Sequence, residues 1–471
     1  MLMKNPLTQP KFLPKLLSAD GLSEALSLFE PMVDAVKRRN EMPQNAVTLR
    51  ADLDQESEQK LRSLLQSIAE NVANNEVLSF DQLKDTLHFA RLLILEGAEH
   101  PKEYASSLFL LANVDGSAEN FLSDLAIKSG AGLDAVFENC TGYPEPELRN
   151  YATRVQFLKS KMIPAQAFYV NTLGRSAEQV HQEDDLRVAL QAFIKTLNVD
   201  SFASANAIRE AVIQFVRDNP KLAWAMIPAV KPSFLWQAKE KARFALLTWV
   251  GLVVLFWFWP LLLGWVVMLQ LKENKDVPDT HRPTLPHLTQ LRSREDYFVH
   301  NQFSAAGSLK PGLMRKWTVK VVLGAAQVTL RHIFNKGDLA GVPLLGLEGV
   351  DTIHFARWIL IDDDTRMLFA SNYDGSLESY MVDFIDKVAW GLNLVFSNGQ
   401  GYPFTRWLVG EGARNEEKFK DFIGNHQIET QVWYASYGHL SAVNIANNAE
   451  IRAGLLGAMS DAEAERWLAR I

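Results

Sequence analysis

Two stretches of the chain carry the same polar residues at the same spacing. Residues 371–387 have the sequence SNYDGSLESYMVDFIDK, and residues 112–128 have the sequence ANVDGSAENFLSDLAIK. In each, an Asn is followed by an Asp-Gly-Ser turn, by a Glu two residues later and by an amphipathic run. The Asp carboxylate could act as a general acid or base or bind a ligand, or it could only cap the helix that follows the turn. The repeated segment therefore predicts a site, or a structural turn, that is used twice.

A histidine and an arginine precede each of these segments at matching positions. The sequence DTIHFARWILI occupies residues 351–361, and DTLHFARLLIL occupies residues 85–95. A hairpin turn at Asp363-Asp364 would place His354 opposite Tyr373, and it would bring the start of one strand to the end of the next. We therefore expect a polar cluster at the end of each hairpin, made of Asp351, Thr352, His354, Asn372 and Asp374 in the second copy and of Asp85, Thr86, His88, Asn113 and Asp115 in the first.

These clusters and the arginines beside them supply the candidate site residues. An arginine in so apolar a strand needs a carboxylate or a bound anion as its partner. Each histidine could be a general acid, a haem ligand or a hydrogen-bonded structural residue. Capping of the next helix by Asp374 or Ser376 is the alternative to direct work on a ligand. The candidate catalytic residues are Asp374, Arg357, His354 and Asn372, and the candidate ligand-binding residues are Asp115, Asn113, His88 and Arg91.

The two segments belong to a longer internal duplication. Residues 108–144 align without a gap on residues 367–403, with 15 identical residues in 37 positions. The matching DTxHFAR segments precede this block in both copies, and QAFYVNT and QVWYASY follow it. Three similar blocks in the same order indicate a duplicated fold rather than chance.

Both copies predict the same order of elements, βαββαβ, which is the ferredoxin-like split βαβ unit. Strands are predicted at 45–53, 86–95, 107–114 and 166–172 in the first copy, and at 296–305, 351–361, 366–373 and 430–437 in the second. The predicted fold class is therefore α+β, with two tandem ferredoxin-like repeats that pair their sheets as a pseudo-dimeric α/β barrel. The predicted domains are a helical N-terminal extension (1–43), repeat 1 (44–215), a membrane segment with a polar linker (216–295) and repeat 2 (296–471).

An uncharged segment of 26 residues, from Phe244 to Leu269, is inserted between the repeats and contains four tryptophans. As a helix it would be about 39 Å long, enough to cross a bilayer. Pro260 would kink or break this helix, and a break would give a re-entrant or monotopic hairpin with both repeats on one side of the membrane. A single crossing would instead place the repeats on opposite sides. Basic residues at both ends favour the cytoplasmic face of the inner or plasma membrane.

Composition narrows the range of partners. The formal net charge is -7, and no basic stripe or RNA-binding signature is present, so nucleic acid is not an expected partner. The single cysteine, Cys140, excludes an intramolecular disulfide framework and a cysteine-based metal site. The expected partners are membrane lipid and a small hydrophobic molecule, and the chain could also form an oligomer.

The duplicated fold and the Asp-Gly pair resemble the dye-decolourising haem peroxidases of the dimeric α/β-barrel superfamily. That family carries a Gly-x-x-Asp-Gly motif whose Asp acts on the distal side of haem. The corresponding residues here are SNYDG (371–375) and ANVDG (112–116), with Ser371 and Ala112 in place of the leading glycine. The resemblance implies haem as a cofactor, Asp374 as the distal acid or base and Arg357 as the group that stabilises bound peroxide. His332 and His439 are the candidate iron ligands, without a motif around either.

Two functions follow from these observations. The first is a membrane-associated, haem-dependent peroxidase-like oxidoreductase that acts on hydrophobic or lipid-derived substrates. The second is a non-enzymatic, membrane-anchored binding or scaffold module, in which the repeated polar residues only brace the hairpins and cap the helices.

Overall fold

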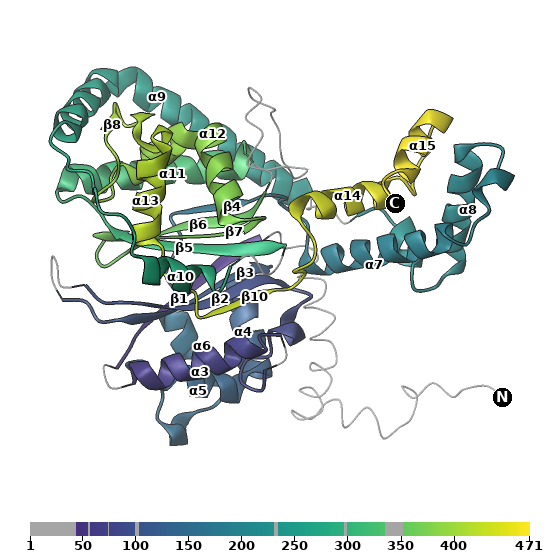
Figure 1. Cartoon of the computed structure of the whole chain (residues 1–471), viewed down its shortest axis with the longest axis horizontal. Coiled ribbons are helices and arrows are strands. Elements are labelled where there is room, and N and C mark those ends of the chain that lie inside the picture. Colours follow the sequence, from purple (N-terminus) through teal and green to yellow (C-terminus); the bar gives the residue numbers. More distant parts are fainter. Residues whose placement is uncertain are drawn as a thin grey trace, which may run out of the picture.

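The computed structural model describes residues 44–54, 57–73, 75–98, 103–229, 234–295, 299–334 and 352–471. The predicted helical extension at 1–43 and the candidate Asp351 lie outside the described residues. The fold is α+β, as expected, and is built on two four-stranded antiparallel sheets. Figure 1 shows the two sheets in the middle of the molecule with helices above and below them.

The first sheet is covered on its outer face by helices of the first repeat. Every second side chain along its strands faces these helices and packs with them in one core that includes Leu49, Leu61 and Phe137. In order across the sheet, the strands are β1 (Gln44–Asp52), β3 (Ser107–Asp115), β2 (Leu87–Leu95) and β10 (Val432–Ala435), and the helices are α3 (Glu58–Glu70), α4 (Ala118–Lys128), α5 (Gly130–Phe137) and α6 (Tyr151–Ser160).

The second sheet repeats this arrangement with its own helices. Its core includes Phe303, Tyr373 and Phe419, all of which are buried. In order across the sheet, the strands are β4 (Ala167–Val170), β6 (Ile353–Ile361), β7 (Arg366–Asp374) and β5 (His300–Ser308), and the helices are α11 (Leu313–His332), α12 (Leu377–Phe396) and α13 (Glu416–His426). The short elements α10 (Leu285–Arg292), β8 (Thr405–Arg406) and β9 (Gly410–Glu411) lie in the same half of the chain.

The fourth strand of each repeat lies in the sheet of the other repeat. Strand β4 comes from the first repeat but pairs with β6, and β10 comes from the second repeat but pairs with β2. The predicted segments 44–215 and 296–471 therefore do not form separate sheets. Because each completes the other, the two halves of the chain must remain on the same side of any membrane.

The two sheets pack face to face, and their inner faces share an apolar core. Leu93 and Phe109 of the first sheet and Ile359 and Leu368 of the second belong to this core. The described side chains of β2 and β6 are buried along the whole length of both strands. Burial on both faces explains why these strands are almost continuously apolar in sequence rather than alternating.

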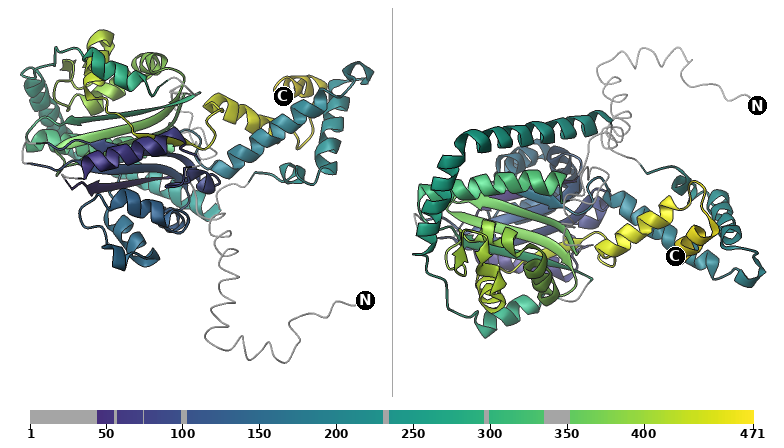
Figure 2. Two further views of the ribbon diagram at one scale, coloured as in Figure 1. Left: turned by 60° about the horizontal axis from the view of Figure 1, so that its bottom comes forward. Right: turned by 90° about the horizontal axis from the view of Figure 1, so that it is seen from above.

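A helical arm projects from one end of the sheets, as Figures 1 and 2 show. It pairs helices from both repeats, α7 with α14 and α8 with α15, around a separate core that includes Leu186, Val212 and Trp467. The helices are α7 (Ala177–Ile194), α8 (Ala205–Asp218), α14 (Ala442–Ala453) and α15 (Asp461–Leu468).

The predicted membrane segment forms one helix, α9 (Phe234–Glu273), of 40 residues. Within the described part of the chain, it is the one helix that is long and apolar enough to cross a membrane. Pro260 lies inside this helix, so the predicted break is wrong. Figure 2 shows that α9 bends instead as it passes around the second repeat, as expected where proline removes one backbone hydrogen bond.

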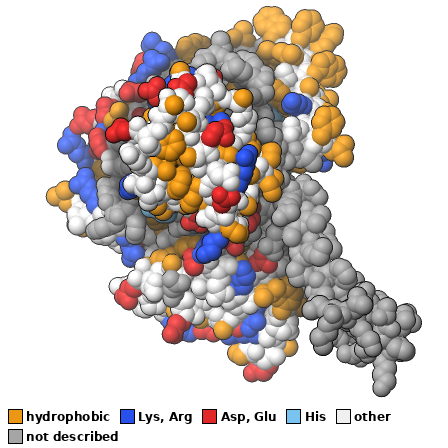
Figure 3. Space-filling view, turned by 90° about the vertical axis from the view of Figure 1, so that its right-hand side faces the viewer, with side chains coloured by type: hydrophobic (Ala, Val, Ile, Leu, Met, Phe, Trp, Pro, Cys, Tyr) orange, Lys and Arg blue, Asp and Glu red, His pale blue; other side chains and the backbone are white. Residues whose placement is uncertain are grey.

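Both ends of α9 are held against the second repeat. Glu240 pairs with Arg331 of α11 at 2.8 Å, and Glu273 accepts a hydrogen bond from Thr405 Oγ1 at 2.5 Å. Between them, Trp265 Nε1 donates to Thr318 Oγ1 at 3.0 Å. The apolar side chains of the middle of α9 are exposed, and in Figure 3 they lie at the upper right of the surface.

Candidate functional site

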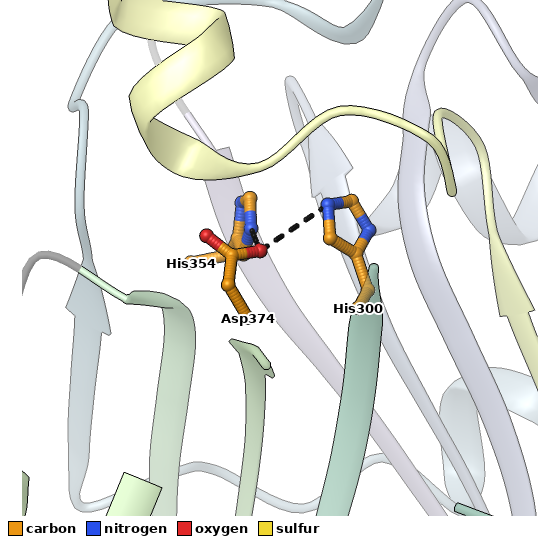
Figure 4. A group of neighbouring side chains, drawn as sticks. All are labelled: His300, His354 and Asp374. Carbon is orange, nitrogen blue, oxygen red and sulfur yellow. Dashed lines mark hydrogen bonds and ion pairs between the residues drawn. The ribbon is translucent and has the colours of Figure 1, made fainter. Parts of the chain in front are cut away.

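The polar cluster of the second repeat is centred on the Asp374 carboxylate, at the end of β7. Asp374 Oδ1 lies 2.7 Å from His354 Nε2 and 3.4 Å from His300 Nε2. Asp374 Oδ2 accepts a hydrogen bond of 2.7 Å from the backbone N–H of Ala442, in the first turn of α14. Both imidazole rings point toward this carboxylate (Figure 4). The structure therefore brings the predicted His354 and Asp374 together and adds His300 and the start of a distant helix.

The first repeat has the same arrangement around Asp115. Asp115 Oδ1 lies 2.9 Å from His88 Nε2, and Asp115 Oδ2 accepts from the N–H of Ala177 at the start of α7 at 2.7 Å. His88 Nδ1 lies 2.7 Å from the hydroxyl of Tyr437. Each repeated Asp thus holds its histidine and accepts the first N–H of the helix that follows the fourth strand of its own repeat, beside the N-caps Ser176 and Ser441. The expectation that Asp374 caps the helix directly after it is wrong for this residue.

The serine of each repeated segment caps the helix that directly follows it, which is one of the two alternatives predicted. Ser376 Oγ accepts from the N–H of Ser379 at 3.2 Å, and Ser117 Oγ accepts from that of Asn120 at 3.1 Å. Gly375 adopts a φ of +78°, which allows the tight turn between β7 and α12.

We expect Ser376→Ala to destabilise the protein by about 1 kcal/mol, because the N-cap acceptor of α12 is removed. Chemical denaturation in detergent measures this change. Ser379→Ala is the matched control, since Ser379 contributes only its backbone N–H to the cap. Equal stability of the two variants would contradict the capping role.

The hairpin register differs from the prediction at the histidine itself. The turn lies at Asp362–Asp364, whose φ values are positive, and Phe355 faces Asn372 as expected. Ile353 rather than His354 faces Tyr373, however, because the ladder shifts between Ile353 and Phe355. The first repeat has the same irregularity between Leu87 and Phe89. Such a bulge re-aims a side chain, here a buried histidine in both repeats.

The two predicted arginines have backbone carbonyl oxygens of the opposite sheet, rather than a carboxylate, as partners. Arg357 donates to the carbonyl oxygens of Val47 and Ala112 in the opposite sheet, at 2.7 Å each. Arg91 donates to the carbonyl oxygens of Phe303 and Ser371, also at 2.7 Å each. Burial lowers the pKa of both guanidinium groups to about 9, so they remain charged at neutral pH. Each arginine ties the two sheets together.

The two repeated asparagines meet between the sheets. Asn372 Nδ2 donates to Asn113 Oδ1 at 3.2 Å, and Asn372 Oδ1 accepts hydrogen bonds from Arg91 and from Trp433 Nε1. The structure therefore brings all eight predicted residues of the two hairpins to the interface of the sheets or to its end. Their contacts are with one another, with backbone and with aromatic rings.

His300 is a member of the cluster that sequence analysis missed. It begins β5, where it faces Asp374 across the ladder, and its ring lies 4.4 Å from that of His354 between centroids. Burial, together with the neighbouring His354, lowers the pKa of His300 to about 3, so the ring is neutral at neutral pH. Gln44 faces Asp115 at the same place in the first repeat. Pairing of the first and third predicted strands could have placed His300 beside Asp374.

The described residues do not fit the haem ligation that the resemblance implies. His332 lies on α11 beside Glu240 and Phe244, and exposed His439 Nε2 pairs with Asp184 Oδ2 at 2.7 Å. Neither histidine is part of the cluster at Asp374. Both Asp374 oxygens are occupied, and Arg357 is directed to backbone carbonyls. Haem binding remains a prediction, and a Soret absorption band of the purified protein would be its signature.

An apolar cavity lies under the helices of the second repeat, between the outer face of its sheet and helices α12 and α13. It measures about 590 Å³ when gaps between atoms and space open to solvent are counted, and its free volume is about 40 Å³, so a ligand would enter only if the lining side chains moved apart. Its ionisable lining residues are Tyr380 and His426, and burial lowers the pKa of His426. Tyr380, Met381 and Phe384, which sequence periodicity assigns to the core, line this cavity.

A second, smaller hollow lies between the repeats at the end of the sheets. It encloses about 340 Å³ on the same measure, and its lining includes His88, His354, Arg175 and Tyr437. This hollow gives the otherwise buried histidine cluster a path toward the surface.

No family model, no curated protein and no solved structure matches this chain. Its function must therefore be argued from its own residues.

Proposed function

We propose that the chain is a membrane-anchored binding protein built from two ferredoxin-like repeats that form a single α/β barrel. In this proposal α9 lies in one face of the membrane, and the repeats remain together on the side from which α9 enters. The observation that carries the proposal is the long apolar surface of α9. Of its 40 residues, only Glu240, Leu269 and Glu273 are buried.

The exposed surface of α9 has the composition of a membrane contact. Phe256, Trp257 and Leu261 each expose more than two thirds of their surface, which is a large patch for a helix that faces only water. Bulky tryptophans along the helix suit the level of the lipid headgroups. Lys239, Lys241 and Arg243 precede the apolar part, and Lys272 and Lys275 follow it. Basic flanks at both ends favour the cytoplasmic face.

The exchanged strands support the same-side arrangement. Strands β4 and β10 each complete the sheet of the other repeat, so a bilayer cannot separate the repeats. Both ends of α9 also contact the second repeat. A bent helix lying in the plane of one membrane face meets these constraints, whereas a single crossing between the repeats does not.

The contacts of the repeated polar residues support a binding module over an enzyme. The repeated Asp, Arg and Asn side chains hold helix ends, sheets and one another together. A group that performs acid–base chemistry must instead reach a proton of the substrate. The apolar cavity under α12 and α13 suggests the ligand class, a small hydrophobic molecule that partitions into membranes.

Flotation of the full-length protein with phosphatidylcholine–phosphatidylglycerol vesicles tests the anchor. We expect the double variant Phe256→Glu and Leu261→Glu to lose membrane binding by more than about 100-fold, because each charge at the middle of an inserted helix opposes insertion by roughly 2.5 kcal/mol or more. Leu148→Glu, an exposed apolar position outside α9, is the control.

Two outcomes would contradict the proposal. One is flotation of the double variant to the same extent as the unaltered protein. The other is a soluble, monodisperse unaltered protein that leaves the vesicles behind in the absence of detergent.

A further inference from the structure

We infer that His300, His354 and Asp374 form a binding site for one divalent transition-metal ion. His300 and His354 lie at the start of β5 and β6, and Asp374 lies at the end of β7. These three strands are neighbours, so the three side chains lie at the same end of the second sheet. Their candidate ligand atoms all lie within 4.8 Å of one another, and all three residues are buried. Figure 4 shows the two rings directed at the carboxylate from β5 and β6.

The distances within the cluster suit a shared ion. Ligands bound at about 2.0–2.2 Å to one metal lie roughly 3 Å apart, and the Nε2 atoms lie 2.7 Å and 3.4 Å from Asp374 Oδ1. Asp374 Oδ2 is held by the Ala442 N–H, which fixes the carboxylate in place. Backbone support of a ligating carboxylate is typical of metal sites. The Leu440 carbonyl oxygen, which His300 Nε2 contacts, is a further oxygen donor at the cluster.

The donor set indicates the class of ion. Two imidazoles and one carboxylate bind Zn²⁺ or Fe²⁺ and leave further positions for water or another ligand. No thiolate takes part, because the single cysteine, Cys140, is buried in the core of the first repeat. Ions that prefer sulfur, such as Cu⁺, are therefore not expected. The hollow lined by His354 and Tyr437 supplies a route of entry.

The position of His300 in the second repeat is occupied by Gln44 in the first repeat. At the matching position Gln44 satisfies the following loop with both ends of its amide, donating to the carbonyl oxygens of Thr172 and Arg175 and accepting from the N–H of Gly174 at 3.0 Å. Among the described residues, buried His300 Nδ1 has no hydrogen-bond partner. His300 instead directs Nε2 at the Asp374 carboxylate and the Leu440 carbonyl oxygen, and an imidazole nitrogen is a common metal ligand, which a Gln amide is not.

The charges around Asp374 also favour a bound cation. The Asp374 carboxylate is buried beside two imidazoles and a helix N-terminus, and no arginine or lysine pairs with it among the described residues. A buried carboxylate requires a compensating charge. A divalent cation between His300, His354 and Asp374 would provide it.

Titration of the chelator-treated, full-length protein in detergent with Zn²⁺ tests the site. We expect one equivalent to bind in competition with a chromophoric chelator and to raise the melting temperature, because an ion that binds only the folded state stabilises it. His300→Gln and His354→Gln should each weaken binding by more than about 100-fold, since loss of an outer-sphere partner alone costs 10–100-fold. Co²⁺ should give a visible absorption spectrum that His300→Gln abolishes.

His287→Gln is the control for binding to histidines elsewhere, because His287 lies on α10 and contacts Gly424 instead. His300→Gln introduces the residue that the first repeat accommodates at the same place, and circular dichroism and gel filtration establish that it is folded. An equivalent that binds His300→Gln as tightly as the unaltered protein would overturn the site, as would no binding at all. Vesicle flotation of His300→Gln should be unchanged, so failure of the metal site is distinguishable from failure of the membrane anchor.

Discussion

Replacement of Arg357 by alanine is expected to destabilise the protein by about 3–5 kcal/mol. The guanidinium donates to the carbonyl oxygens of Val47 and Ala112 and contacts Thr48 Oγ1, all in the opposite sheet. Without it, two buried carbonyl groups lose their partners, at about 1–3 kcal/mol each, and a cavity remains between the sheets. Urea denaturation in detergent, followed by circular dichroism, measures the change.

The matching contacts made by Arg91 in the opposite direction supply the comparison. Arg91→Ala should have a similar effect, because Arg91 makes the equivalent contacts in the other direction. Arg62→Ala is the matched control, since Arg62 makes only a half-exposed ion pair with Glu58 on the same helix, which is worth roughly 0.5 kcal/mol. Arg357→Lys should also be unstable, because a single ammonium group cannot reproduce the planar fork. A folded Arg357→Ala protein of unchanged stability would restore the anion-binding role predicted from sequence.

The elements themselves could be predicted from the sequence because their signals are local. The DDDT segment between β6 and β7 forms the expected turn, at Asp362–Asp364. All eight predicted strands are present, with boundaries shifted by a few residues. Ser117 and Ser376 cap the next helices as the Asp-Gly-Ser spacing indicates. Duplication strengthened these predictions, since each element was seen twice.

The contacts between distant elements could not be predicted in the same way. Periodicity shows that β4 and β10 are strands but not which sheet they join, so their exchange was missed. The shift at His354 depends on packing around the histidine rather than on turn chemistry. Arg357 and Arg91 were expected to need a charged partner, whereas the partners are backbone carbonyls that no side-chain pattern reveals. His300 was missed because its partner, Asp374, lies three elements later in the chain.

Removal of the Asp374 carboxylate is the second change with a large expected effect. Asp374→Ala should destabilise the protein by about 2–4 kcal/mol, because the first N–H of α14 loses its carboxylate acceptor and buried His354 loses its partner. The Ala442 amide should also exchange its hydrogen faster, since α14 is then free to detach at its first turn. Denaturation and hydrogen exchange followed by mass spectrometry measure these two effects.

Asp374→Asn separates a brace from a catalytic group. The Asn amide oxygen can still accept from the Ala442 N–H, and its NH₂ can donate to His354 in the other tautomer, so we expect a loss of only about 1 kcal/mol. Asp115→Ala should resemble Asp374→Ala, with the faster exchange at Ala177 and α7 instead. Asp386→Ala, on the exposed face of α12, is the control. An Asp374→Ala protein with unchanged stability and unchanged exchange at α14 would contradict the brace. Because Asp115 has the same two contacts as Asp374 but no second histidine, any effect confined to Asp374 variants is expected to come from His300 and from what that cluster binds.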